Sequence, residues 1–247
     1  MAKQESIVHR LNLRATDVLI LATLAFFSVL TLGFQVRVEG WLALLLRNLV
    51  VMAIYVVLMQ LACHASRKPV RFGLRVVPVA LTFGYLFEVV DKLQLILHGR
   101  WMDGTVLRIE EAIFGIQPTL WLQAFTRPAV TEWMMFSYLF YFVMYPLICG
   151  IIFFRVGERA MEDFLFTLSL TNVLCDLGFI LFPVAGPMAA IGAQFSVPLD
   201  GYVCTWLGEW VRTRLQFPGG SIPSPHCAAA TVMWVMAFRH HRPTFWF

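Results

Sequence analysis

The residues best able to do chemistry form a short turn ahead of a run of small side chains. The turn reads Ser221-Ile-Pro-Ser224-Pro-His226, follows a Gly-Gly pair and leads into Cys-Ala-Ala-Ala. A helix that begins here offers free backbone N–H groups and the positive end of its dipole, which favour an anion such as phosphate. Histidine ordinarily titrates near neutrality, so His226 is able to protonate a departing alkoxide, while Ser224 caps the helix or donates to the anion.

A purely structural interpretation fits the same residues. Ser224 is a good N-cap, Pro225 suits the first helical turn, and His226 is then an interfacial histidine satisfied by water. Spacing alone favours neither interpretation.

The elements that must position this turn are membrane helices. Hydrophobic residues make up 59% of the 247 and charged residues 14%, with a mean hydropathy of +0.72, which is outside the range of soluble domains. Runs of about 20 apolar residues predict spans, so we expect an all-α, polytopic transmembrane bundle of about six spans, folded as one membrane domain over residues 1–247. The predicted spans are Val18–Val36, Leu42–Cys63, Val76–Leu97, Trp133–Phe154, Asp163–Phe182 and a short sixth, Ser224–Phe238.

The distribution of Lys and Arg predicts the orientation. Basic residues gather in the N-terminal tail, in 67–75, in 155–159 and in 239–242, so these segments are expected in the cytoplasm. The Gly99–Glu132 and Pro183–Pro223 loops and His226 are then non-cytoplasmic. Within the first loop, Thr105–Phe125 is predicted to be an amphipathic interfacial helix, or alternatively a re-entrant cover. The net charge of +4 is scattered and indicates no nucleic-acid partner.

Several strings resemble one known family. Pro223-Ser224-Pro225-His226 is similar to the P-S-x-H motif of the type-2 phosphatidic acid phosphatase superfamily. The strings Phe114-Gly-Ile-Gln-Pro118, Phe182-Pro-Val-Ala-Gly-Pro187 and Pro198-Leu-Asp-Gly201, with Glu132, Tyr138 and Tyr141, resemble its inositol phosphorylceramide synthase branch. The resemblance covers a core of about residues 101–247.

The resemblance implies a phosphohistidine mechanism. In that superfamily a histidine of a third motif attacks phosphorus, an aspartate orients it, and the P-S-x-H histidine protonates the leaving group. His226 is then the general acid and Ser224 a phosphate ligand, and neither a metal nor another cofactor is required. Water as acceptor gives a phosphatase, and an alcohol gives a phosphotransferase such as an inositolphosphotransferase.

Two of the superfamily's motifs have no counterpart. The basic first motif is missing and Met188 follows Gly186-Pro187, so Arg212, Arg214 and Arg100 are the cations available for phosphate. No histidine is followed four residues later by aspartate. Pro243–Phe247 resembles the start of a further span, and we expect the chain to be truncated before the third motif and inactive until that motif is supplied.

We therefore expect an integral membrane enzyme of lipid phosphates, in a plasma or inner membrane, whose substrate is a phospholipid or polyprenyl phosphate. The alternative is a non-catalytic lipid-binding or assembly protein that retains the fold. A small transporter is a weaker rival, motivated by intramembrane charges. The five cysteines stand singly and predict neither a metal centre nor a disulfide framework.

Overall fold

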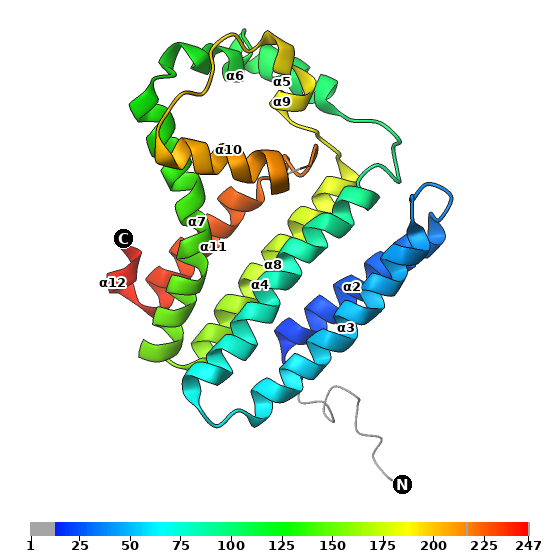
Figure 1. Cartoon of the computed structure of the whole chain (residues 1–247), viewed down its shortest axis with the longest axis vertical. Helices are drawn as coiled ribbons and strands as arrows, with labels where there is room; N and C mark the ends of the chain where they lie inside the picture. The colour runs from blue at the N-terminus through cyan, green and yellow to red at the C-terminus, as the bar shows by residue number, and fades with distance from the viewer. Residues whose placement is uncertain (1–12, 216, 247) are drawn as a thin grey trace.

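Five long helices form the body of the protein in a computed structural model that describes residues 13–215 and 217–246 (Figure 1). They are α2 (Ala15–Gly33), α3 (Trp41–His64), α4 (Lys68–Leu93), α7 (Pro128–Arg155) and α8 (Glu158–Leu181). All five are long and apolar enough to cross a membrane. The described residues form no strand, so the expected helical membrane bundle is confirmed.

A shorter helix completes the bundle. α11 (Pro225–His240) packs against α7 and α8, and the four-residue α12 (Arg242–Phe245) turns back beside it. α11 has 16 residues, fewer than a typical span of about 20. This length agrees with the short sixth helix expected from the sequence.

Short helices form a cover over the end of the bundle where α11 begins (Figure 1). Their bounds are α5 (Asp103–Phe114), α6 (Pro118–Trp121), η1 (Leu122–Phe125), α9 (Pro187–Ala190), η2 (Gly192–Gln194) and α10 (Val203–Leu215). The segment expected as one amphipathic helix is thus broken into three, because Gly115 takes a left-handed φ of 69° and ends α5. We call this end of the bundle the histidine end.

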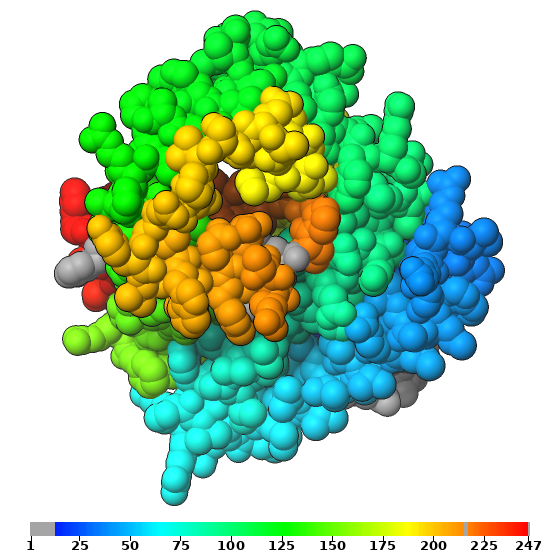
Figure 2. Space-filling model, turned by 45° about the horizontal axis from the view of Figure 1, so that its top comes forward, coloured from blue at the N-terminus to red at the C-terminus, as the bar shows by residue number. Residues whose placement is uncertain are grey.

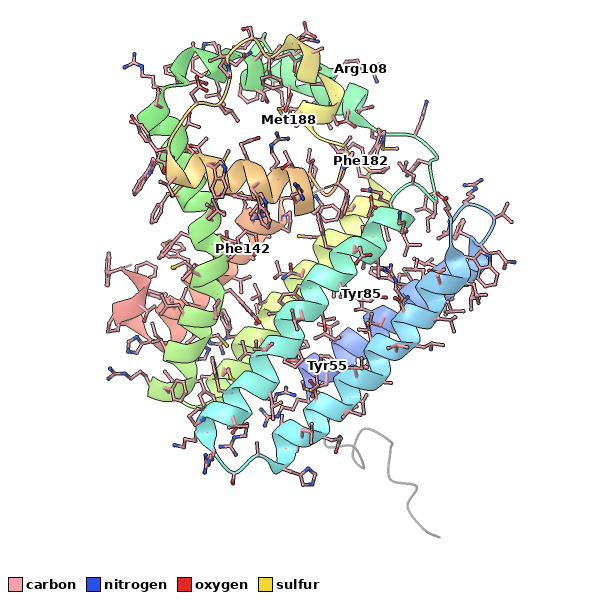
Figure 3. The ribbon with its side chains drawn as sticks, viewed as in Figure 1. Tyr55, Tyr85, Arg108, Phe142, Phe182 and Met188 are labelled. Carbon is pink, nitrogen blue, oxygen red and sulfur yellow. The ribbon has the colours of Figure 1, made fainter. Side chains whose placement is uncertain are left out.

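Charged residues are buried at the opposite end, which we call the charged end. The Arg75 guanidinium, 1% exposed, donates to both carboxylate oxygens of Asp17 at 2.9 and 3.0 Å and to Glu162 at 2.7 and 2.9 Å. Tyr55 of α3, labelled in Figure 3, donates its hydroxyl to Asp17 of α2 at 2.9 Å. The cluster joins α2, α3, α4 and α8.

The position of Arg75 differs from the sequence expectation. Its basic segment was expected to be a loop before a span starting at Val76, but α4 already begins at Lys68. Arg71 and Arg75 therefore lie on the helix, where they reach carboxylates of neighbouring helices: Glu158 for Arg71, at 3.5 Å, and Asp17 and Glu162 for Arg75.

Candidate functional site

His226 lies in the first turn of α11. Ser224 is the N-cap residue with an extended backbone, and its hydroxyl oxygen accepts the Cys227 N–H at 3.3 Å. Pro225 occupies the first helical position, where a missing N–H costs nothing. Because Ser224 uses an oxygen lone pair for the cap, its hydroxyl hydrogen remains free to donate to an anion at the helix start.

Aromatic rings of α7 surround the imidazole. The ring centroid of His226 is 5.0 Å from that of Tyr138, 4.9 Å from Tyr141 and 6.0 Å from Phe142. Phe142 is labelled on α7 in Figure 3. Burial among these rings lowers the pKa of His226, because desolvation disfavours the charged imidazolium, so a proton on this ring is more readily given up.

The turn before His226 packs closely on α4 and α8. Gln94, the C-cap residue of α4, donates its amide to the Pro218 carbonyl at 3.0 Å, and the Phe87 and Phe217 ring centroids lie 4.3 Å apart. Gly219 has φ 125° and a side chain there would meet the Gln94 amide, so only glycine fits. On α8, Gly178 leaves the space that Pro223 fills. These contacts fix where α11 starts.

A carboxylate of the cover supports the same turn from the other side. Asp103, 8% exposed at the start of α5, accepts the N–H groups of Ala185 at 2.9 Å and Gly186 at 2.8 Å. Ala185 in turn accepts the Gly219 N–H at 3.3 Å, and Gly186 lies against Ser221. Asp103 thus connects the cover to the turn that carries His226, a role that sequence reasoning missed because the contact spans 82 residues.

A second carboxylate holds α10 on α7. Glu132 accepts the N–H groups of Tyr202 and Cys204 at 2.7 Å and of Thr205 at 3.0 Å, and also the Thr205 hydroxyl at 2.9 Å. A carboxylate at a helix N-terminus satisfies free N–H groups and complements the dipole. Glu132 was singled out from the sequence only as part of the family resemblance, and its capping of α10 is new.

The two arginines proposed from the sequence lie in the last turns of α10. Arg212 forms an ion pair with Glu209 at 2.6 Å, and that hydrogen bond raises the pKa of Arg212, so its guanidinium stays charged. Arg214 is exposed. Figure 2 shows a hollow between α10 and the chain that leads into it, next to α9. Met188, labelled in Figure 3, is 54% exposed on α9.

The remaining histidines have other positions. His240 is 14 residues along α11 from His226, roughly 21 Å at 1.5 Å per residue. His98 contacts the Leu181 carbonyl at 3.0 Å, and His241 contacts the Thr244 hydroxyl. Within the described ranges no three His, Cys, Asp or Glu side chains group in a way that could hold a metal ion.

One known protein family matches the part of the chain that contains His226. Residues 104–247 match the family described as the PAP2 superfamily, which is the type-2 phosphatidic acid phosphatase superfamily. The match contains the cover apart from Asp103, and also α7, α8, α10 and the His226 turn. Searches of curated proteins and of solved structures returned no match. Because the family match spans more than half of the chain, this protein belongs to the PAP2 superfamily of lipid phosphatases and phosphotransferases.

Proposed function

We propose that this chain carries the general acid and the phosphate-binding residues of a lipid phosphotransferase or phosphatase site. The N-capped start of α11 binds the phosphate of a membrane lipid, Ser224 and the N–H groups contact its oxygens, and His226 protonates the leaving alkoxide. The observation that carries this proposal is the position of His226, in the first turn of a capped helix and against the Tyr138 and Tyr141 rings.

Arg212 and Arg214 complete the phosphate site in this proposal. They stand two positions apart in the last turn of α10, which lies over the end of the bundle where α11 begins. Arg212 already shares its charge with Glu209, so Arg214 supplies the larger part of the attraction. The distribution of basic residues supports a non-cytoplasmic position for this end of the bundle, with the N-terminus in the cytoplasm.

The acceptor in the proposed reaction is an alcohol, as in the inositolphosphotransferase branch, or water. A phosphohistidine route also needs a nucleophile, and the sequence has no histidine followed four residues later by aspartate. We propose that this pair comes from another polypeptide segment, which enters beside His226. Without it the chain binds a lipid phosphate and does not turn it over.

Phosphorus NMR of the reconstituted protein tests the proposal. Phosphatidate in nanodiscs should stay intact with the chain alone and be consumed when a membrane helix carrying His-x-x-x-Asp is added. His226→Ala should abolish that consumption, whereas the matched His240→Ala, at the other end of α11, should leave it unchanged. Consumption that persists in His226→Ala would contradict the assigned role.

A second candidate is a lipid-binding or assembly protein that keeps the fold without catalysis. The absent His-x-x-x-Asp pair favours it. It predicts that no added helix produces turnover, while phosphatidate still binds at the α11 start.

A further inference from the structure

One face of α10 carries large apolar side chains that no other part of the described chain covers. Val203 and Trp206 are 74% and 68% exposed, and Leu207 and Trp210 are exposed beside them. Their spacings of three, four and seven residues place them on one face of the helix. Figure 2 shows α10 at the surface of the molecule. A contiguous exposed apolar face of this kind marks contact with a protein or a membrane.

The opposite face of α10 packs on the side of α7. Thr205 is buried and donates its hydroxyl to Glu132 at 2.9 Å, and Gly208 lies against Met135. Met135 stands 20 residues before Arg155, the last residue of α7, which is roughly 30 Å at 1.5 Å per residue. The hydrocarbon core of a bilayer is also about 30 Å thick. If Arg155 marks one membrane boundary, α10 therefore lies at the other.

The apolar face of α10 continues a surface that faces the membrane. A hollow of about 410 Å³ joins Trp133 and Phe136 of α7 to Tyr202 and Cys204 at the start of α10. Trp133 and Phe136 are exposed on a helix that is long and apolar enough to span a membrane. α10 itself lies across the end of the bundle instead of along it (Figure 1). This arrangement is typical of an amphipathic helix in the plane of the membrane interface.

The last turn of α10 has a charge that suits this position. Arg214 is exposed and continues the stripe of Val203, Leu207 and Trp210, at spacings of four, three and four residues. Arg127, exposed before the start of α7, lies at the same end of the bundle. An arginine at the edge of an apolar face keeps its stem in the apolar layer and reaches the lipid phosphates. Tryptophan is also enriched at this level of a membrane.

We propose that α10 is an interfacial helix, which inserts Trp206 and Trp210 into the leaflet at the histidine end of the bundle. The partner of its exposed face is thus the lipid surface, between headgroups and acyl chains. The inference rests on packing and depth and does not depend on the proposed catalysis. It adds that the bilayer fixes the depth of Arg212 and Arg214, which stand in the last turn of the same helix.

Spin-label depth measurements on the full 247-residue protein in nanodiscs test this position. Nitroxides at Val203→Cys and Leu207→Cys are compared for collision with oxygen, which concentrates in the bilayer, and with a water-soluble nickel chelate. Both should collide mainly with oxygen, at a depth of about 5 to 10 Å below the headgroups. The background protein carries Cys63→Ser, Cys204→Ser and Cys227→Ser, because these three cysteines are not buried.

Two further labels calibrate the depth. Phe140→Cys lies on the exposed side of α7, near the middle of the span, and should collide with oxygen most strongly. Ser66→Cys lies in the turn between α3 and α4, where Ser66 is exposed, and should collide mainly with the chelate.

Removal of the two tryptophans tests what holds α10 in the membrane. Trp206→Gln combined with Trp210→Gln should raise chelate collision at Val203→Cys several-fold, because amide side chains gain little from the apolar layer. Trp234→Gln on α11 is the matched control, since Trp234 is also exposed but lies away from α10. This control should leave the label at Val203→Cys unchanged.

Two outcomes would overturn the inference. Chelate collision at Val203→Cys as strong as at Ser66→Cys would place α10 in water. Protection of that label from both oxygen and the chelate would show that a protein covers the helix. The measurement requires neither phosphate binding nor turnover, so its failure is distinct from failure of the catalytic proposal.

Discussion

The two ends of the bundle manage charge in opposite ways. At the charged end, Arg14, Arg71 and Arg75 pair with Asp17, Glu158 and Glu162. Arg75 and Asp17 are buried, and the other four side chains are partly exposed. At the histidine end, Asp103 and Glu132 accept hydrogen bonds from backbone N–H groups. Of the two α10 arginines, Arg212 pairs with Glu209 and Arg214 is exposed. The first arrangement stabilises the helix bundle, and the second leaves positive charge available for a ligand.

Charged groups that are already paired inside the protein are poorly suited to binding a ligand. A buried pair with all its hydrogen bonds made has no capacity left for a ligand, and removing one partner leaves the other unpaired. A carboxylate that caps a helix fixes the backbone without neutralising an arginine. Ligand binding is therefore expected at the histidine end, where the carboxylates accept hydrogen bonds from backbone N–H groups.

The largest effect is expected from Arg75→Met at the charged end. This variant leaves Asp17 and Glu162 without their buried partner, which costs about 3 to 5 kcal/mol of unfolding free energy. Unfolding in mixed micelles followed by circular dichroism measures it. The triple variant that also carries Asp17→Asn and Glu162→Gln should recover part of the loss, and a single variant as stable as the unmodified protein would refute the cluster's role.

Asp103→Ala should have the next largest effect, at the histidine end. Two N–H groups lose a charged acceptor, which costs on the order of 3 kcal/mol. Because Asp103 supports the Gly219 turn, affinity for lysophosphatidate should fall together with stability. Isothermal titration in nanodiscs checks the affinity. Full affinity in a destabilised Asp103→Ala protein would show that the cover does not position the site.

Glu132→Gln should destabilise the start of α10 more than the rest of the fold. The amide keeps one acceptor oxygen but loses the charge that holds three N–H groups, so the α10 start should exchange amide hydrogens faster. Hydrogen exchange with mass spectrometry measures this. Exchange in α2 and α3 should not change, and equal acceleration in all helices would indicate general destabilisation instead.

The smallest effect is expected for Arg47→Ala. Arg47 pairs with Glu88 at 2.8 Å, but the two side chains are 48% and 54% exposed. An exposed pair contributes between about 0 and 1 kcal/mol, so unfolding should barely change. If Arg47→Ala lowered the unfolding free energy as much as Arg75→Met, exposed and buried ion pairs would contribute equally, contrary to this prediction.

Sequence patterns predicted the helices because apolar runs are local. The five long helices follow runs such as Leu42–Cys63, and the Ser224 cap with Pro225 marks the α11 start correctly. Glu88, Asp91 and Lys92 stand at helical spacings that suggest pairing along one helix, but Glu88 pairs with Arg47 of α3. Local spacing does not reveal which neighbouring helix approaches a charged side chain.

The site was only partly predictable for the same reason. His226 and Ser224 stand in one short string. Asp103 is 83 residues away from its partner Gly186 in the sequence, and Gln94 is 124 residues away from its partner Pro218. Asp103 stands alone in the sequence, and no pattern around it indicates that it binds the N–H groups of Ala185 and Gly186. Arg75 was assigned to a loop, because a basic residue beside an apolar run ordinarily marks a membrane boundary.

The central claim is that the start of α11 binds a lipid phosphate, and an affinity measurement tests it most directly. Lysophosphatidate and monoacylglycerol of the same chain length are titrated into the protein in nanodiscs. The unmodified protein should prefer the phosphate by about tenfold or more, as expected for charge-assisted hydrogen bonds. Combined Ser224→Ala, His226→Ala and Arg214→Ala should remove that preference, while Arg239→Ala should keep it. Equal affinity of the unmodified protein for both lipids would contradict the account.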